Sequence, residues 1–428
     1  MPSVVVIGAQ WGDEGKGKII DFLAKKADVI VRAQGGNNAG HTVIVGENKH
    51  TFHLLPSGVL YEEKMNIIGN GVVIDPQAFL DEIKTLESRG INTANIRIDE
   101  RAHVIFPYHK KIDVLAEEER GETKIGTTKK GIGPCYMDKV ERTGIRVGEM
   151  IDKELFKQRL FPQIDRKNKI LEKIYNVEGF CKESMLRDYE QYASQIKEYV
   201  TDTTIIVHEA LVSNKRVLLE GAQGALLDVD LGTYPYVTSS HPTSGGFCVG
   251  AGVNPLQIDD VLGVVKAYTT RVGFGPFPTE LINETGDRIR KEGNEFGTTT
   301  GRARRCGWFD GVAVKYTARI NGMTGISLML LDVLSIFDKI NICTGYEYEG
   351  KTIHNFPASI KELAKCRPIY KEVDGWKEDI TSVKTFEELP DNAKKYIKII
   401  EEYLKIPIKI VSVGPKRSQT IIREEIFE

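Results

Sequence analysis

Residues 4–18 read VVVIGAQWGDEGKGK, and this stretch decides how the chain begins to fold. The β-branched run 4–7 predicts a buried first strand, and residues 16–26 carry an apolar face with helical spacing. The junction contains four glycines: Gly8, Gly12, Gly15 and Gly17. A strand, a glycine-rich loop and a helix N-terminus form a phosphate cradle, because backbone N–H groups point at the anion and the glycines let the backbone approach it.

The loop is close to the P-loop pattern G-x-x-x-x-G-K-[ST] but does not complete it. Residues 12–18 fit the first seven positions, whereas Ile19 stands where the pattern has the hydroxyl that holds Mg²⁺. Asp13 and Glu14 lie inside the loop, where a carboxylate repels phosphate unless Mg²⁺ lies between them or the carboxylate acts as a base. On the pattern alone, a P-loop, a cradle containing a base and a solvated charged turn all remain open.

The composition is that of an ordinary globular protein. With 428 residues and no convincing linker, we expect one large core rather than several domains. A net charge of −2 argues against partners such as nucleic acid or membrane, and no apolar run approaches the ~18 residues of a membrane span. The chain starts with a strand and lacks a signal-peptide pattern. Its cysteines form no C-x-x-C pair, so we expect reduced thiols, no zinc and a cytoplasmic location; they are Cys135, Cys181, Cys248, Cys306, Cys343 and Cys366.

The order of the predicted elements favours a parallel sheet. A second strand at 29–32 follows the first helix, and the β-α-β order implies a right-handed crossover. The expected fold class is α/β: a single large domain over 1–428 around a mainly parallel central sheet, with a P-loop-like phosphate-binding start and with helical and hairpin excursions. The helical excursion covers about 151–215. The other predicted elements are hairpins at 43–54 and 340–355, helices at 75–89, 108–120, 385–404 and from 310, a loop at 121–134, and strands at 103–106, 217–219, 261–270, 327–331 and 408–413, the last being the final strand.

Three further loops carry groups suited to anions. Residues 40–42 (GHT) offer an imidazole and a hydroxyl, and 127–130 (TTKK) offer hydroxyls and positive charge. Residues 298–305 (TTTGRARR) concentrate three hydroxyls and three guanidinium groups, and arginine pairs bidentately with carboxylate and phosphate. A lone histidine in a glycine loop is more often structural than catalytic, and a basic turn can be plain surface, so these alternatives stay open. Together the loops indicate phosphoryl-transfer chemistry on a nucleotide and a small carboxylate.

Longer motifs, in order along nearly the whole chain, point to one family. They are WGDEGKGK at 11–18, QGGNNAGHT at 34–42, IGTTKKGIGP at 125–134, EGAQG at 220–224, GTYPYVTSS at 232–240, GTTTGRARRCGW at 297–308, LDV at 331–333 and SVGPKR at 412–417. In these blocks the chain closely resembles the adenylosuccinate synthetase family.

The resemblance implies a ligase that condenses IMP with L-aspartate, driven by GTP, to give adenylosuccinate, GDP and phosphate in the first committed step from IMP to AMP. The γ-phosphoryl of GTP moves to O6 of IMP, and the aspartate amino group then displaces phosphate from C6. Asp13 is implied to take the N1 proton and to bind Mg²⁺ together with the Gly40 carbonyl. His41 is implied to act as general acid at the GTP phosphates.

The resemblance also implies the substrate contacts and a homodimer in which Arg142 reaches the IMP 5′-phosphate of the neighbouring subunit. The implied IMP contacts are Asp13, Glu14, Lys16, Asn38, Thr128, Arg142, Gln223, Thr238 and Arg302. The implied aspartate contacts are Thr298, Thr299, Thr300 and Arg302. The implied GTP contacts are Gly12, Gly15, Lys16, Gly17, Lys18, Gly40, His41, Thr42, Arg304, Leu330, Asp332, Ser412 and Gly414. Many members have K-L-D where this chain has Leu330-Leu331-Asp332, so the lysine that lies along the guanine is missing here, while Asp332 is still expected to read the guanine N1–H and amino group.

Three other classes of function compete with a ligase. A GTP-binding switch has no use for a base at Asp13 or for the 298–304 loop. A nucleic-acid-dependent ATPase is disfavoured by the absence of a basic stripe with aromatic residues. A binding scaffold without activity is disfavoured because every catalytic position that can be matched is filled.

Overall fold

The fold is taken from a computed structural model that describes residues 3–38, 40–45, 48–121, 124–297, 301 and 303–427. Between 41 and 51 it describes the backbone alone. Within the described residues, no helix combines the length and the apolar character needed to cross a membrane.

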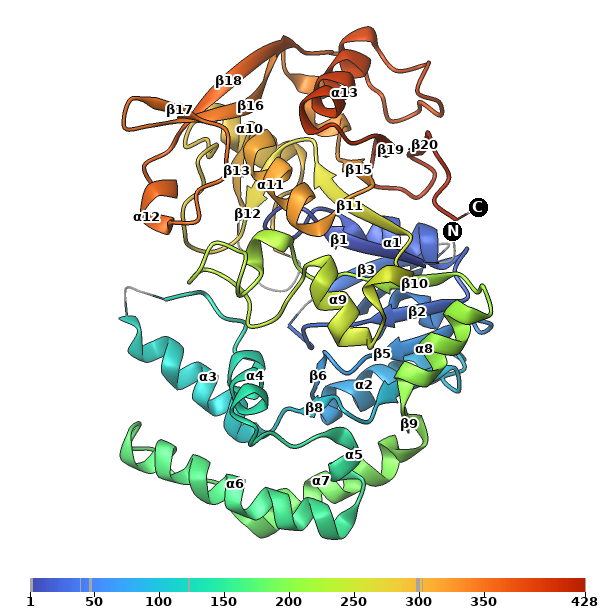
Figure 1. The fold of residues 1–428 in the computed structure, drawn as a ribbon, viewed down its shortest axis with the longest axis vertical. Coiled ribbons are helices and arrows are strands. Elements are labelled where there is room, and N and C mark those ends of the chain that lie inside the picture. The colour runs from blue at the N-terminus through green and yellow to red at the C-terminus, as the bar shows by residue number, and fades with distance from the viewer. Residues whose placement is uncertain are drawn as a thin grey trace.

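A ten-stranded sheet runs through the middle of the molecule, with the strand order β20-β19-β15-β11-β1-β10-β2-β5-β7-β9 (Figure 1). Every neighbouring pair is parallel except β19 and β20, so the predicted α/β class with a mainly parallel sheet is confirmed. The strands are β1 (Ser3–Gly8), β2 (Val29–Arg32), β5 (Met65–Ile68), β7 (Ile96–Asp99), β9 (Val200–Thr201), β10 (Val217–Glu220), β11 (Asp260–Lys266), β15 (Gly325–Met329), β19 (Ile408–Ser412) and β20 (Thr420–Ile422).

The first strand is central because both of its faces are apolar. Val4 and Val6 pack with α1 (Lys16–Ala24), whereas Val5 and Ile7 face the opposite side, and all four side chains are fully buried. Successive side chains of a strand point to opposite faces, so a β-branched run of this kind fits a strand covered on both sides.

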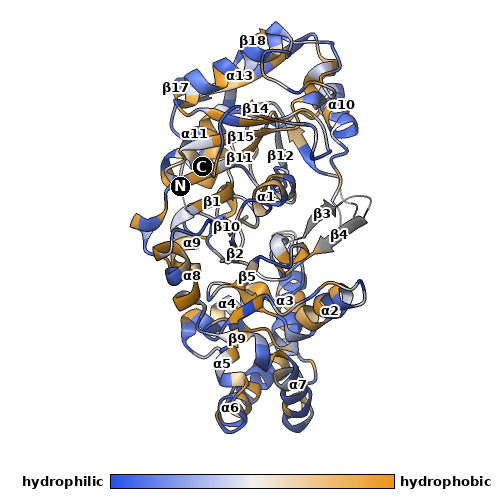
Figure 2. Cartoon of the chain, turned by 90° about the vertical axis from the view of Figure 1, so that its right-hand side faces the viewer, coloured by the Kyte–Doolittle hydropathy of each residue, from blue (hydrophilic) through white to orange (hydrophobic). Residues whose placement is uncertain are grey.

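The other helices surround this sheet and extend beyond its ends. They are α2 (Pro76–Glu87), α3 (Pro107–Glu119), α4 (Ile132–Glu141), α5 (Val147–Met150), α6 (Lys153–Lys173), α7 (Lys182–Ile196), α8 (Thr203–Val212), α9 (Ser244–Ala251), α10 (Glu284–Glu292), α11 (Gly311–Asn321), α12 (Ile360–Leu363) and α13 (Asp391–Leu404). Helices α6 and α7 occupy the lower end of the molecule, where hydrophilic residues colour much of their surface (Figure 2). Their buried stripe, which includes Phe156, Leu160 and Tyr189, packs into one core with Phe106 of the segment before α3.

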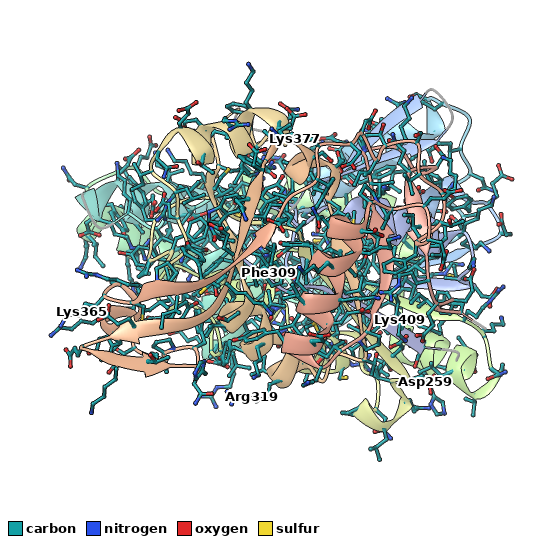
Figure 3. The ribbon with its side chains drawn as sticks, turned by 90° about the horizontal axis from the view of Figure 1, so that it is seen from above. Asp259, Phe309, Arg319, Lys365, Lys377 and Lys409 are labelled. Atoms are coloured by element: carbon teal, nitrogen blue, oxygen red, sulfur yellow. The ribbon has the colours of Figure 1, made fainter. Side chains whose placement is uncertain are left out.

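The upper end of the molecule is built by the smaller sheet of β14 (Phe309–Asp310), β16 (Lys339–Tyr348), β17 (Lys351–Ile353) and β18 (Arg367–Asp374). Seen from above, Phe309 lies within the packed side chains, whereas Lys365 lies at the rim (Figure 3). The three remaining pairs are short: β3 (His41–Val45) with β4 (Asn48–Phe52), β6 (Val73–Ile74) with β8 (His103–Val104), and β12 (Thr269–Arg271) with β13 (Arg305–Gly307).

Four predicted boundaries are wrong. The long strand at 261–270 is two strands, because the chain leaves the sheet after Lys266 and β12 pairs antiparallel with β13. The loop at 121–134 ends early, since α4 begins at Ile132. The helix at 385–404 begins only at Asp391, after Pro390. The strand ending near 413 is not the last, because β20 follows it.

Candidate functional site

The loops with chemistry leave the carboxyl ends of neighbouring parallel strands. Residues 9–15 follow β1, residues 33–40 follow β2, residues 221–243 follow β10, and residues 330–332 and 413–419 follow β15 and β19. In open α/β sheets this edge forms the ligand crevice.

Glu14 shapes the loop after β1 from within. Its side chain has no exposed surface, and its Oε1 accepts hydrogen bonds from the backbone N–H groups of Gln10, at 3.0 Å, and Gly12, at 2.8 Å. Its Oε2 accepts one from Lys16 Nζ at 2.6 Å. Two N–H groups that a phosphate cradle offers to an anion are therefore already bound to the chain's own carboxylate.

The side chain of Asp13, unlike that of Glu14, projects out of the loop. Its side chain is 45% exposed, and its φ of 58° lies in the left-handed region that an aspartate tolerates better than most residues. Its Oδ2 accepts a hydrogen bond from Arg304 Nε at 2.7 Å. Partial desolvation raises the pKa of Asp13, but the positive charges of Arg304, Lys266 and Lys16 outweigh it and hold the pKa below its usual value. Asp13 is therefore a carboxylate at neutral pH.

Arg304 is itself held by a buried group of charges. Its NH1 donates to Glu295 Oε2 at 2.7 Å, while Lys266 Nζ donates to Glu295 Oε1 at 2.6 Å and the Tyr268 hydroxyl donates to the same oxygen. Glu295 is 1% exposed, so its charge needs these partners. Neither Glu295 nor Lys266 was predicted from the sequence; the signal for Lys266 was a lysine at the end of the apolar run VLGVVK.

The loop after β10 lies directly against the loop after β1. A Cβ atom added to Gly8 would lie 2.5 Å from the Gln223 carbonyl oxygen and 2.7 Å from Lys16 Nζ, so only glycine allows this approach. Gln223 Nε2 donates to Thr238 Oγ1 at 3.1 Å. Around Gly35 the Asn38 and Gln223 side-chain oxygens lie 3.6 and 4.0 Å from the place of an added Cβ. The structure thus brings four of the expected IMP contacts together: Lys16, Asn38, Gln223 and Thr238.

Asp332 lies at the opposite end of the crevice, at the start of the 3₁₀ helix η6 (Asp332–Ile336). Its Oδ1 is buried, and no described residue donates a hydrogen bond to it. Burial raises the pKa of Asp332, while a hydrogen bond from its own backbone N–H and the charge of Lys18 lower it. A buried acceptor without a donor is costly unless a ligand supplies one.

Lys18 points to the turn after β19. Its Nζ donates to Ser412 Oγ at 2.7 Å, to the Gly414 carbonyl at 2.8 Å and to the Gln419 carbonyl at 2.9 Å. Burial lowers its pKa to about 8, and the charge of Asp332 acts in the opposite direction. In a P-loop the lysine at this position binds a phosphate. Here its N–H donors bind the turn instead.

The expected residues of α4 and of the loop before it are accessible. Thr128 is exposed, and the Glu117 carboxylate accepts hydrogen bonds from the N–H groups of Ile125, Gly126 and Thr127. Arg142 is exposed at the C-terminal end of α4 with a φ of 66°. Within the described part of the chain Arg142 has no ion pair, and its neighbour Glu141 pairs with Arg166. The expected Thr298, Thr299, Thr300 and Arg302, and the side chains of His41 and Thr42, lie outside what the structure describes.

One group of potential metal ligands lies in the loop after β10: Asp228, Asp230 and His241. Asp228 is buried, and its two oxygens already accept hydrogen bonds from the N–H groups of Asp230 and Leu231 and from the Thr243 hydroxyl. These bonds account for Asp228 as a group that shapes the loop.

Comparisons with known proteins agree on one family. A family model described as adenylosuccinate synthetase matches residues 5–421. The adenylosuccinate synthetase of Alkaliphilus metalliredigens is 71% identical over 427 residues, and that of Clostridioides difficile 61% identical over 428 residues, each covering 100% of both chains.

Solved structures show the same likeness. The fully ligated adenylosuccinate synthetase of Plasmodium falciparum superposes with a TM-score of 0.93 at 42% identity, covering 99% of this chain and 100% of that one. The succinoaminodeoxyadenylate synthetase of cyanophage S-2L, bound to dGMP and dATP, gives a TM-score of 0.61 at 19% identity over 99% of this chain and 95% of that one. At that identity the second likeness concerns the fold alone.

Proposed function

The chain belongs to the adenylosuccinate synthetase family, and from this premise we propose how its residues carry out the reaction. Its activity is the GTP-dependent ligation of IMP with aspartate in AMP synthesis. One observation carries the assignment of residues: the accessible carboxylate of Asp13 stands next to Lys16 and Arg304, beside the cluster of Asn38, Gln223 and Thr238.

In the first step Asp13 takes the proton from N1 of IMP, and the electron pair moves to O6. O6 attacks the γ-phosphorus of GTP, the bond from that phosphorus to the β,γ-bridging oxygen breaks, and GDP leaves. The low pKa of Asp13 supports this role, because the group begins as a carboxylate. The ion pair with Arg304 opposes uptake of the proton, so Arg304 exchanges Asp13 for the GTP phosphates when GTP binds.

In the second step the amino group of aspartate attacks C6, the C6–O6 bond breaks, and the departing phosphate takes the proton that the amine loses as the C–N bond forms. Phosphorylation is needed because the purine oxo group is otherwise a poor leaving group. The aspartate carboxylates meet the hydroxyl and guanidinium groups of Thr298, Thr299, Thr300 and Arg302. The composition of this loop supports the assignment, since guanidinium groups bind carboxylates bidentately.

The remaining contacts divide between the two nucleotides. Lys16, Asn38, Gln223 and Thr238 hold IMP with Thr128, and Asp332 reads the guanine of GTP with its unpaired Oδ1. His41 acts as general acid at the GTP phosphates. Glu14 supports the loop rather than touching IMP, because all of its described contacts are internal.

The donors at Asp13 fit Mg²⁺. Of the two carboxylate oxygens of Asp13, only Oδ2 accepts a hydrogen bond from a described residue, so Oδ1 remains available as a hard oxygen ligand. The Gly40 carbonyl is a second oxygen of the type that Mg²⁺ prefers. When bound, Mg²⁺ neutralises charge on the GTP phosphates.

The active form is a homodimer in which Arg142 contacts the IMP 5′-phosphate of the neighbouring subunit. The exposed Met137 and Val140 on α4 support this, since they form an apolar strip directly before Arg142. The backbone N–H of Gly35, in the loop after β2, donates to the hydroxyl of Tyr136 on the same helix. A cytoplasmic location is supported by six unpaired cysteines, five of them buried.

The test is an absorbance assay of the purine with IMP, L-aspartate, GTP and Mg²⁺, each left out in turn. Product forms only with all four present, and phosphate is released in equal amount. Release of phosphate without aspartate would point to a GTPase instead. An equal rate without Mg²⁺, after chelation, would remove the metal from the proposal.

A further inference from the structure

Lys18 has an unexpected set of partners for the lysine of a glycine-rich nucleotide loop. Its ammonium group has three N–H donors, and all three are engaged by the turn that begins at Ser412. A phosphate oxygen would have to displace one of these acceptors. Lys18 is only partly exposed, so water does not readily replace a lost partner.

The turn that Lys18 binds is closed on itself. The Val413 N–H donates to the Gln419 carbonyl at 3.0 Å, and the Gln419 N–H donates to the Lys416 carbonyl at 3.0 Å. Gln419 also donates to Thr381 through Nε2 at 3.1 Å. Lys18 thus attaches a preformed turn, as one unit, to the first helix.

The same turn is attached to the segment of Asp332. The Leu331 N–H donates to the Ser412 carbonyl at 3.1 Å, directly before Asp332. Lys18 and Asp332 also interact through their charges, which favours the ionised form of each. Three pieces of chain meet at Lys18: α1, the start of η6 and the turn 412–419.

We propose that the Lys18 side chain is a positioning group for base specificity: it holds the turn 412–419 and Asp332 in register to receive guanine, and its ammonium group makes no contact with the triphosphate. This inference rests on the proposed function, in which Asp332 reads the guanine of GTP; Ser412 and Gly414 are among the expected GTP contacts. Sites that pair buried polar groups with a base discriminate strongly only while their geometry is kept.

The two possible roles of Lys18 differ in a measurable way. A phosphate ligand contributes equally to GTP and ATP, because both carry the same triphosphate. A residue that builds the guanine pocket contributes to GTP alone. The experiment therefore measures kcat/KM for GTP and for ATP, at saturating IMP and aspartate, in the wild type and in Lys18→Met, which keeps the length of the side chain without its donors.

We expect Lys18→Met to lower kcat/KM for GTP at least about tenfold, which corresponds to about 1.4 kcal/mol, with kcat/KM for ATP and KM for IMP changed less than about twofold. Lys18→Arg, which keeps the charge and donors, should restore part of the preference for GTP. Lys25→Met, at the exposed end of the same helix, is the matched control and should behave as wild type.

Equal losses with GTP and ATP would place Lys18 on the triphosphate and overturn the inference. An unchanged ratio in a folded Lys18→Met would overturn it as well, because the contacts would then be structural only. If Lys18→Met does not fold, Lys18→Gln, which keeps an N–H₂ donor on a shorter side chain, is measured in its place, and an unchanged GTP-to-ATP ratio there has the same meaning. Failure of the proposed function is seen separately, because a wild type that does not ligate IMP and aspartate with GTP fails before any variant is compared.

Discussion

Asp13 and Arg304 are joined by a hydrogen bond of 2.7 Å between Oδ2 and Nε, although 291 positions separate them in the chain. The same guanidinium donates to Glu295, so one side chain connects an accessible carboxylate to a buried one. The arrangement keeps Asp13 ionised in the absence of substrates and also opposes its protonation. In the proposed mechanism, turnover requires this ion pair to open, and the GTP phosphates give Arg304 another anion to bind.

Asp13→Asn should lower kcat by at least ~10²-fold, because the amide has a similar shape but does not take a proton. Loss of the half-exposed ion pair should cost no more than about 1 kcal/mol of stability. IMP affinity by calorimetry should stay near that of the wild type. Asp165→Asn, which removes a surface partner of Lys182, serves as the control. More than about a tenth of wild-type kcat in Asp13→Asn would exclude Asp13 as the base.

His41→Asn should lower kcat by ~10²–10³-fold, the usual effect of removing one group that stabilises developing charge. The Kd for IMP should remain unchanged, because the expected partner of His41 is GTP. Steady-state kinetics together with direct titration of IMP separates the two quantities. A variant in which only IMP binding weakens would identify His41 as a residue that positions IMP.

Asp332→Asn should reduce the preference for GTP over ATP. Among the described residues nothing donates to the buried Oδ1, and in the proposed function guanine supplies its donor. Mismatches of this kind reach roughly 10⁴-fold in kcat/KM. The asparagine presents one N–H₂ group toward the donors of guanine, so GTP should lose more than ATP. Equal kcat/KM values for GTP and ATP in the wild type would contradict the reading of guanine by Asp332.

Mixing inactive Arg142→Leu with inactive Asp13→Asn should restore activity. Random exchange of subunits makes half of the dimers hybrid, and each hybrid has one site with both native residues, so about a quarter of the wild-type activity is expected. Each variant incubated alone is the control. If mass spectrometry shows hybrid dimers and the mixture stays inactive, Arg142 does not act across an interface.

Asp310 should make stability depend on pH in an identifiable way. Burial raises its pKa from 3.8 to about 6, although the Tyr346 hydroxyl donates to it. A pKa that is higher in the folded state contributes stability that is complete below pH 3.8 and is lost as the pH rises through about 6, by about 3 kcal/mol in total. Asp310→Asn keeps a helix N-cap at α11 without this titration. Its Tm relative to wild type should therefore rise between about pH 4 and pH 7, and parallel Tm curves would contradict the prediction.

Local signals were sufficient for the start of the fold. The apolar run of β1, the glycine loop and the face of α1 depend on neighbouring residues, and so does the helix that Asp75 and Pro76 begin. The elements that the sequence did not reveal depend on distant partners. Strand β5 lies between β2 and β7, and its sequence MNII alone carries no clear alternation.

The candidate site also combines local and distant information. The motifs identified its residue types, but they did not identify the hydrogen-bond and ion-pair partners of those residues. Nothing in the sequence near Glu14 indicates that its carboxylate turns inward to bind the loop's own N–H groups. Likewise, only the assembled fold shows that Glu295 anchors Arg304 and that Lys18 reaches Gln419, 401 positions away.

The order of strands in the central sheet limits how much of this protein can fold while it is still being synthesised. Strand β1 is made first, yet the strands on its two sides begin at Val217 and Asp260, and the turn that Lys18 binds comes later still. A nascent chain therefore carries a glycine-rich loop with nothing to bind it for most of its synthesis, and pairing over such distances is slow and exposes apolar strands. The loop after β1 therefore reaches its native partners only when the chain is nearly complete.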